Sequence, residues 1–277
     1  MPELPEVESA RRVIEQHALG RRIVDVDDSD TYECRPHRPG DLRSALVGRE
    51  LTAAHRRGKS MWCETSGTAA DPGPGPHLGI HLGMSGKVVV ADPDGVEADG
   101  GDYWERGRQV GDERFTRFAM TFDDGGRLLL LDPRRLGRVR LDPEVHLLGP
   151  DAATISLREF RSALARGTAP VKARLLDQTA VAGVGNLLAD QALWQARLHP
   201  RRRVDELTDD EVRVLHRAVR SAVQTAQRRG GVHTLRLLPF RAAGAECPRD
   251  GAPMVRGTVG GRTTWWCSAE QGGAAGG

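Results

Sequence analysis

The chain has 277 residues, of which 28% are charged, and its formal net charge of +2 is only weakly basic. This length allows two domains, and the charge permits a nucleic-acid partner without indicating one. No apolar run approaches the ~20 residues that cross a membrane, and no signal-peptide pattern precedes Pro2, so we expect a cytoplasmic protein. Four cysteines, at positions 34, 63, 247 and 267, are too scattered for a disulfide framework and are expected to be thiols or metal ligands.

The first eight residues combine an amine, acids and a helix start. If Met1 is removed, Pro2 carries a secondary amine with a pKa near ~8, which can attack an electrophilic carbon and form an iminium. Glu3 is then a candidate acid or base, and Glu6 lies just inside a helix opened by Pro5. An ordinary helix start fits the same residues, and on these residues alone it is the better interpretation. Its buried face would be Val7, Ala10, Ile14 and Ala18.

Short β patterns bounded by turn residues follow this helix up to about residue 146. Together with the helix they predict an antiparallel β-sandwich or barrel over residues 1–146. The expected strands are Ile23 to Val26, Glu50 to Ala54, Ser60 to Glu64, Leu78 to Leu82, Lys87 to Val90, Phe118 to Phe122 and Leu128 to Leu131.

From about Asp151 the hydrophobic period changes from 2 to 3.6, which predicts a helical second domain over residues 151–235. A small module over residues 240–270 and a flexible Gly-rich tail over residues 271–277 complete this α+β, two-domain chain. The expected helices are Ser156 to Arg166, Val171 to Gln178, Asn186 to Ala196, and a long helix that starts with the capping sequence Thr208-Asp209-Asp210-Glu211 and stops at Gly230.

Lysine is rare in this chain, since only three of its 40 Lys and Arg residues are Lys. A retained Lys suggests that a compact, titratable ammonium is needed, although for Lys87 we prefer chance survival. Lys59 lies at the start of a predicted strand, in the basic run His55 to Ser60, where a solvated turn that binds nothing is the plainer alternative.

Two glycine-flanked segments are candidate binding sites. Gly83 to Gly86 places Met84 on a tight turn, where it has little to pack against unless a partner arrives, although a lone Met usually belongs to a core. Gly183 to Asn186 precedes an apolar helix, so its N–H groups can hold an anion at a helix N-terminus. A plain turn with Asn186 as N-cap fits this segment equally well.

Several segments together resemble the Fpg/Nei family, the bifunctional DNA glycosylases that excise oxidised bases and then cut the strand. The resemblance runs in register from Pro2 to Arg262. It implies a helix-two-turns-helix domain, a zinc-finger-like β-hairpin, damaged double-stranded DNA as the partner, no cofactor for catalysis, and a monomer. The segments that carry it are Pro2 to Glu8, His81 to Gly86, Asp132 to Gly137, Ala169 to Lys172, Leu175 to Gln178, Gly183 to Asn186 and His199-Pro200.

The resemblance also implies a role for each catalytic candidate. Pro2 would attack C1′ of an extruded damaged nucleotide, and Glu3 would help to open the sugar. Glu6 would order the active-site corner, and Lys59 would hold a phosphate.

The implied DNA contacts lie in both domains. Met84 would fill the hole left by the extruded nucleotide, and Arg134 would face the orphaned base. Leu136 replaces the usual Phe, so stacking beside the hole should be weaker. Phosphate contacts are implied for the helical domain and the hairpin at Lys172, Gly185, Asn186 and Arg262.

The chain departs from the family pattern in its finger and in one loop. Where the family has four cysteines, this chain has Cys247, Asp250, Cys267 and Glu270. A structural zinc site takes four S or N ligands, so we expect a hairpin held by the packing of Trp265 and Trp266, with zinc weak or absent. The short chain between Gly231 and Cys247, and Gln191 in place of the usual Glu, argue against 8-oxoguanine as the specific lesion.

Three functions are compared on this basis. The resemblance favours a DNA glycosylase with AP lyase activity. A protein of the same fold that binds damaged DNA without cutting it, or an AP lyase with little glycosylase activity, is the first alternative. An enzyme whose N-terminal proline shuttles protons on a small keto acid is the second.

Overall fold

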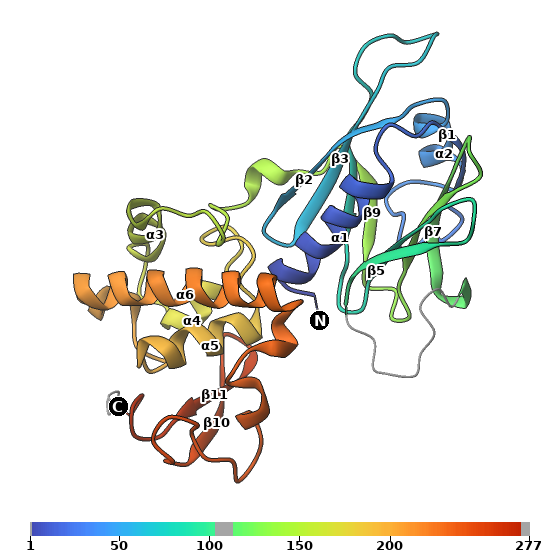
Figure 1. Cartoon of the computed structure of the whole chain (residues 1–277). Helices are drawn as coiled ribbons and strands as arrows, with labels where there is room; N and C mark the ends of the chain where they lie inside the picture. Colours follow the sequence, from blue (N-terminus) through green and yellow to red (C-terminus); the bar gives the residue numbers. More distant parts are fainter. Residues whose placement is uncertain (1, 103–112, 273–277) are drawn as a thin grey trace. The chain divides into compact units, whose positions relative to one another are not determined.

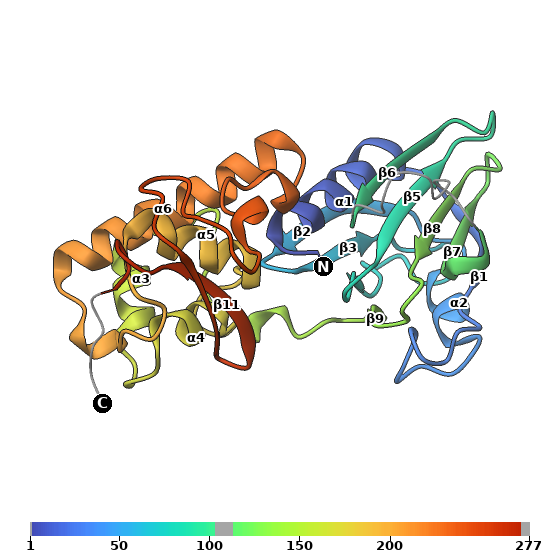
Figure 2. The same cartoon turned by 90° about the horizontal axis from the view of Figure 1, so that it is seen from below.

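The computed structural model describes residues 2–102 and 113–272, which fall into two compact units (Figure 1, Figure 2). Unit 1 comprises Pro2 and Glu6–Val145, and unit 2 comprises Glu3–Pro5 and the chain from His146 onwards. Helix α1 (Leu4–His17) therefore begins in unit 2 and continues in unit 1. Among the described residues, no helix combines the length and the apolar character needed to cross a membrane.

Unit 1 is built on two antiparallel sheets. Side chains from both sheets, from α1 and from the short helix α2 (Asp41–Leu46) share one hydrophobic core, so the sheets form the predicted sandwich. The first sheet has the order β1 (Ile23–Asp27), β7 (Thr116–Phe122), β8 (Arg127–Leu131), β5 (Lys87–Ala91) and β6 (Glu97–Gly101). The second has the order β2 (Leu51–Arg57), β3 (Ser60–Thr65), β4 (Leu78–His81) and β9 (Arg138–Leu141).

The predicted strands of unit 1 are confirmed, with ends that differ by at most three residues. Strand β2 runs on to Arg57, so most of the basic run belongs to a strand and not to a turn. The structure also contains α2, β6 and β9, which the sequence does not predict because each is short and β6, with the sequence Glu-Ala-Asp-Gly-Gly, has no apolar face. The 3₁₀ turn η1 (Glu113–Phe115) precedes β7, and a second 3₁₀ turn, η2 (Val145–Leu147), spans the boundary between unit 1 and unit 2 in the chain.

Lys87 has a defined partner in unit 1. Its side chain is largely buried, and its ammonium lies 2.9 Å from the Asp99 carboxylate on the neighbouring strand. The pairing supplies the counter-charge that a buried ammonium requires, and chance survival of Lys rather than Arg at this position stays a prediction.

Unit 2 is a bundle of helices in which α5 is the central element. Seven of its residues are buried, and it packs along α6, as Figure 1 shows. The capping sequence at Thr208 and the stop at Gly230 are confirmed, the latter with φ of 93°. The helices are α3 (Leu157–Leu164), α4 (Val171–Leu176), α5 (Asn186–Ala196) and α6 (Asp209–Arg229), with 3₁₀ turns η3 (Val204–Glu206), η4 (Val232–Thr234) and η5 (Leu238–Phe240).

The predicted hairpin consists of β10 (Met254–Val259) and β11 (Arg262–Cys267) and packs beside α5. Its turn is Gly260–Gly261, with φ of 58° and 70°, which is the combination that two-residue hairpins favour and glycine allows. Trp265 lies in the hairpin core, and Trp266 contacts the His199 ring with centroids 5.2 Å apart. Packing of both tryptophans is thus as expected.

The predicted flexible tail does not begin at Gln271. This side chain is 1% exposed, accepts a hydrogen bond from the Cys267 N–H at 2.9 Å, and donates to the Leu198 carbonyl at 2.8 Å. Gln271 therefore ties the end of the hairpin to the chain that follows α5. Residues 273–277 of the predicted tail lie outside the described residues.

Replacing Thr208 with Ala should lower the free energy of unfolding by about 1 kcal/mol. The reason is the capping box, in which the Thr208 hydroxyl accepts the Glu211 N–H and the Glu211 carboxylate accepts the Thr208 N–H. Urea denaturation of wild type, Thr208→Ala and Thr208→Ser would measure the effect. Equal losses in the Ala and Ser variants would contradict the capping explanation, because Ser keeps the acceptor.

Candidate active site and DNA-binding residues

The Glu3 carboxylate caps the N-terminus of α5. One oxygen accepts the N–H groups of Gly185 at 3.0 Å and Leu188 at 3.1 Å, and the other accepts the Leu187 N–H at 2.8 Å. Glu3 is fully buried, and three N–H donors at the positive end of a helix dipole stabilise its ionised form. The residue next to Pro2 is thereby fixed as a carboxylate, and Leu4 follows it into the core of unit 2.

This contact corrects the prediction for Gly185. The anion at the helix start is Glu3 of the chain itself, so the Gly185 N–H is engaged and does not serve a DNA phosphate. A Cβ at position 185 would overlap the Glu3 carboxyl group, so the close approach requires glycine here. The N-cap residue is Gly185, whereas Asn186 is the first residue inside the helix.

Asn186 and Lys172 hold the start of strand β11. The Asn186 amide donates to the Thr263 carbonyl at 3.0 Å, and the Lys172 ammonium donates to the Thr264 hydroxyl at 2.7 Å. Asn186 is half-buried, so its amide stays a candidate phosphate contact.

Lys172 is not placed to contact a phosphate directly. Its side chain is 0% exposed and lies 2.6 Å from the equally buried Asp190 carboxylate, which also pairs with Arg241 at 3.0 Å. Burial lowers the pKa of Lys172, while the Asp190 carboxylate opposes this shift. We therefore revise its predicted role: Lys172 supports the hairpin that carries Arg262, which itself is exposed beside the Gly260–Gly261 turn.

Lys59 lies in unit 1, in the two-residue turn between β2 and β3, and is half-buried. Register places Ser60 opposite His81, so Lys59 is close to the start of the turn that carries Met84. The adjacent Arg56 is engaged within the fold, since its guanidinium lies 2.9 Å from the Glu8 carboxylate. The basic run is therefore partly neutralised, and Lys59 stays a candidate for a phosphate contact. Glu6 is buried in the first turn of α1.

A single buried carboxylate, that of Asp132, joins the two turns that carry Met84 and Arg134. Hydrogen bonds reach it from the Ser85 hydroxyl and from the N–H groups of Arg134 at 3.0 Å, Leu136 at 2.8 Å and Gly137 at 2.8 Å.

The backbones of the two turns also touch, because a Cβ on Gly83 would overlap the Leu136 carbonyl. The residues predicted to contact DNA remain accessible on these turns. Arg134 is exposed, Leu136 is 36% exposed and Met84 is half-buried.

The finger residues provide three donors for a metal. Ligand atoms of Cys247, Asp250 and Cys267 lie within 4.8 Å of one another. Glu270 is not part of this group, because its carboxylate pairs with Arg249 and with Arg197. Burial raises the pKa of the Cys267 thiol to about 11, and the thiol donates to Asp250 at 3.2 Å. Three donors do not fit a closed structural zinc site, which needs four.

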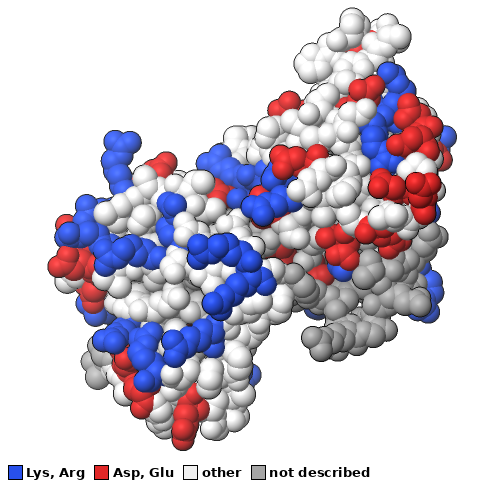
Figure 3. Space-filling view, viewed as in Figure 1, with Lys and Arg blue, Asp and Glu red and all other residues white. Residues whose placement is uncertain are grey.

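Three features that bear on the site are not among the predicted ones, and one of them is readable from the sequence. Residues 146–277 carry 19 Lys and Arg against 12 Asp and Glu, whereas residues 1–145 carry 21 against 26, so the halves have net charges of +7 and −5. Figure 3 shows the basic side chains gathered over the helices of unit 2. The other two features, the carboxylates of Asp132 and Asp190, leave no periodic signal, because their partners are distant in sequence or are backbone groups.

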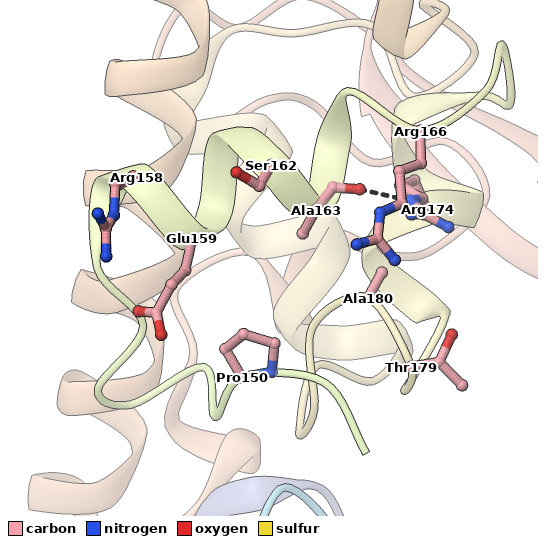
Figure 4. Close-up of a pocket in the computed structure, with 9 residues that line it drawn as sticks. All are labelled: Pro150, Arg158, Glu159, Ser162, Ala163, Arg166, Arg174, Thr179 and Ala180. Carbon is pink, nitrogen blue, oxygen red and sulfur yellow. Dashed lines mark hydrogen bonds between the residues drawn. The ribbon is translucent and has the colours of Figure 1, made fainter. Parts of the chain in front are cut away.

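A hollow of about 650 Å³ lies beside α3 and α4 (Figure 4). Arg174 is fixed there by a 2.8 Å hydrogen bond to the Ala163 carbonyl. None of the predicted site residues lines this hollow, so it is not the candidate site. Its lining residues are Pro150, Arg158, Glu159, Ser162, Ala163, Arg166, Arg174, Thr179 and Ala180.

Replacing Gly185 with Ala should lower the free energy of unfolding by about 2–4 kcal/mol, because the added Cβ displaces a buried carboxylate from three donors. Gly73→Ala is the control, since a Cβ there meets nothing closer than 3.8 Å. Chemical denaturation of Gly185→Ala in wild-type and Glu3→Ala backgrounds forms a double-mutant cycle. The loss should shrink markedly in the Glu3→Ala background, and an undiminished loss would contradict the proposed clash.

Comparison with known proteins identifies relatives over nearly the whole chain. The model of the formamidopyrimidine-DNA glycosylase N-terminal domain matches residues 1–139, and the model of the formamidopyrimidine-DNA glycosylase H2TH domain matches residues 148–236. A formamidopyrimidine-DNA glycosylase of Chloroflexus aurantiacus is 32% identical over 289 residues, which cover 96% of each chain.

Two similar solved structures are complexes of Lactococcus lactis Fpg. One, with DNA containing an abasic site, is 27% identical with a TM-score of 0.79, and the match covers 97% of this chain and 99% of that chain. The other, with DNA containing an oxidised pyrimidine, is 28% identical with a TM-score of 0.78, over 98% of this chain and 99% of that chain. The fold and the helix-two-turns-helix domain are thus as predicted. The two matched domains and the relative at 32% identity together show that this chain belongs to the formamidopyrimidine-DNA glycosylase family.

Proposed function

We propose that this protein is a base-excision-repair DNA glycosylase with AP lyase activity, which removes damaged bases from double-stranded DNA and nicks the strand. The observation that carries the proposal is the buried anchor at Glu3. Because this carboxylate is held by three N–H groups of α5, the adjacent Pro2 has a fixed backbone position at the mature N-terminus. Family membership and the DNA complexes of the solved relatives support the same conclusion.

The reaction begins with the secondary amine of Pro2, exposed by removal of Met1. Its nitrogen lone pair forms a bond to C1′ as the bond from C1′ to the base breaks, and the base leaves with a proton. The nitrogen then loses its proton, the C1′–O4′ bond breaks and O4′ takes up a proton, which gives an iminium between Pro2 and C1′ that withdraws electrons from C2′. Loss of a C2′ proton then expels the 3′ phosphate, and water releases the sugar fragment from Pro2.

Glu3 is suited to the cationic steps of this reaction. As an ionised carboxylate beside Pro2, it stabilises positive charge on the nitrogen and can accept a proton from it. Donating a proton to the sugar, as expected from the resemblance, suits it less in this state, because three N–H groups favour the deprotonated form. We assign to Glu6 the role of ordering the active-site residues at the N-terminus, and to Lys59 a phosphate contact.

Both units supply DNA contacts in this proposal. In unit 1, Met84 enters the space left by the extruded nucleotide, and Arg134 and Leu136 face the opposite strand. In unit 2, Asn186 and Arg262 contact phosphates, and the net charge of +7 attracts the duplex. The site of action is the compartment that holds the DNA, which is the cytoplasm in a bacterium.

The proposed lesion is an oxidised pyrimidine or a ring-opened purine rather than 8-oxoguanine. The segment between Gly231 and Cys247 is occupied by two 3₁₀ turns, η4 and η5, and leaves little chain for a capping loop. Gln191 is buried, and its side chain accepts the Leu237 N–H at 2.9 Å, so it serves this segment and does not present an acid to a base.

We also propose that the finger folds without a metal. The Arg249 guanidinium lies over the Trp194 ring at 4.1 Å, donates to the Trp194 carbonyl at 3.0 Å, and pairs with Glu270. This ion pair links the turn after Cys247 to the turn after Cys267, which is the connection that a zinc ion makes in a four-cysteine finger. The charge of Arg249 also disfavours a divalent cation nearby.

Borohydride trapping on DNA with an abasic site should give a covalent complex with the wild-type protein, because only an imine is reduced to a stable crosslink. A protein that retains Met1 should lose trapping and strand nicking by at least ~100-fold while binding the same DNA within about 3-fold. Mass spectrometry must first confirm both N-termini. Full nicking by the Met1-retaining protein would contradict the mechanism, and binding without trapping by the processed protein would identify a DNA-binding protein.

Purified protein should contain far less than one zinc per chain, and a chelator should leave its melting temperature unchanged. Arg249→Ala should lower the free energy of unfolding by about 1–2 kcal/mol, because it removes the less exposed of the two arginines that pair with Glu270, together with its contacts to Trp194. Arg197→Ala is the matched control, since this more exposed partner of Glu270 should matter by less than about 0.5 kcal/mol. Stoichiometric zinc that chelation removes with loss of stability would overturn the proposal.

A further inference from the structure

A second buried carboxyl group, that of Glu33, lies against Asp132 and has no role in the proposed reaction. Both side chains are 0% exposed. The Gly137 N–H is shared between them, at 3.1 Å from Glu33 and 2.8 Å from Asp132. A Cβ on Gly137 would overlap the second oxygen of Glu33, so the two carboxyl groups meet at a position that only glycine permits.

The hydrogen bonds are divided unequally between the two carboxyl groups. Asp132 accepts four, from the Ser85 hydroxyl and three backbone N–H groups, which is the environment of an ionised carboxylate. Glu33 accepts one, and its second oxygen is buried without a partner among the described residues. A proton on that oxygen gives it a hydrogen-bond partner, because the resulting O–H donates to Asp132. The proton also removes one of two adjacent buried negative charges.

The segment that carries Glu33 is joined to the Arg134 turn by other contacts as well. The Glu33 carbonyl accepts the Val139 N–H at 2.9 Å, and Asp30 pairs with Arg135 at 2.8 Å. The exposed ring of Tyr32 lies beneath the guanidinium groups of Arg35 at 3.9 Å and Arg138 at 5.1 Å. Glu33 is thus the buried centre of a connection between residues 30–35 and residues 132–139.

We propose that Glu33 is a positioning residue, which as the protonated partner of Asp132 holds together the turns that present Met84 and Arg134 to DNA. Asp132 is the joint between these turns, because it bonds to Ser85 in one and to backbone N–H groups in the other. Displacing the Asp132 carboxylate therefore weakens the hydrogen bonds that hold both turns in place. This inference deepens the proposed function and rests on it for the DNA contacts.

The arrangement makes the joint sensitive to alkaline pH. Burial, and then the negative charge of Asp132, raises the pKa of Glu33 to about 8. Above this pH two buried carboxylates face each other, and their repulsion separates them. The surrounding charges do not offset this repulsion between Glu33 and Asp132. Asp30 adds a further negative charge, and the nearby Arg135 and Arg117 pair with Asp30. Arg138 donates to the Gly137 carbonyl. On β4 the His81 carbonyl lies near Gly137, and the His81 imidazole accepts the Gly83 N–H at 3.1 Å.

The free energy of unfolding should also depend on whether Glu33 is protonated. The folded pKa of Glu33 lies above its unfolded value of 4.5, so the folded state binds the proton more tightly. The stabilisation is fully present below about pH 4.5 and is lost as the pH rises to about 8. Glu33→Gln, which never ionises, should therefore melt at a higher temperature than wild type, by a margin that grows between pH 5 and pH 8.

The test measures binding to DNA that contains an abasic-site analogue, by fluorescence anisotropy from pH 6.5 to pH 9.5. Wild type and Glu33→Gln should bind alike near pH 6.5, because the Gln amide replaces the O–H donor. Above pH 8 the wild-type Kd should rise at least ~10-fold relative to that of Glu33→Gln, with a midpoint near 8. Glu33→Leu, which has no donor, should bind more weakly at every pH and show no alkaline step.

Glu97→Gln makes the same substitution at an exposed carboxyl group of unit 1 and should keep the wild-type profile, which controls for net charge. Coincident pH profiles for wild type and Glu33→Gln, or Glu33→Leu binding as tightly as Glu33→Gln, would overturn the inference. Borohydride trapping at pH 7 is run in parallel. Absence of trapping at that pH refutes the proposed lyase function, whereas the binding profiles still decide the role of Glu33.

Discussion

The fold around the candidate site depends on one carboxylate at one helix terminus. Glu3 satisfies three N–H groups at the start of α5, groups that otherwise have no intrahelical partner. Burying a charge is costly, and here the helix dipole and the three donors offset the cost. A terminus is normally the least ordered part of a chain, yet here Glu3 is fully buried and is bound to the N-terminus of α5.

The accessible residues of the site are held by polar groups that are themselves inaccessible. Asp132 organises the turns that carry Met84 and Arg134, and Asp190, through Lys172, organises the strand that carries Arg262. A buried carboxylate with a full set of donors fixes backbone geometry more tightly than apolar packing, because each hydrogen bond is directional and leaving one unmade is costly. The exposed side chains can then change with the substrate while their supports stay in place.

In the finger as we propose it, without a metal, an ion pair takes the place of the zinc crosslink. Its core consists of Trp194, Leu237, Met254, Trp265 and two cysteines, and it is capped by the pair of Arg249 and Glu270. A metal holds a small β-hairpin by coordination, whereas the proposed metal-free hairpin is held by buried apolar area and by a cation over an aromatic ring. The residual cluster of Cys247, Asp250 and Cys267 therefore lies in a finger whose two turns are already connected.

The sequence by itself determined the architecture and most of the motif positions. Alternation of apolar residues predicted the sandwich, the change of period predicted the helices, and capping signals located both ends of α6, because these features depend on neighbours within one element. The sequence predicted Lys59 at the start of a strand and Arg262 in a hairpin, and in the structure they lie in the turn just before β3 and beside the hairpin turn.

Only the tertiary structure decided which charged residues face a partner and which face the protein. Lys172 and Gly185 matched a phosphate-binding pattern, yet one is buried against Asp190 and the other binds Glu3. Glu33 shows no pattern at all, because its significance comes from Asp132, about a hundred residues further along the chain. Local sequence reports propensity and spacing, whereas burial and pairing of charges depend on what the fold brings to each side chain from distant segments.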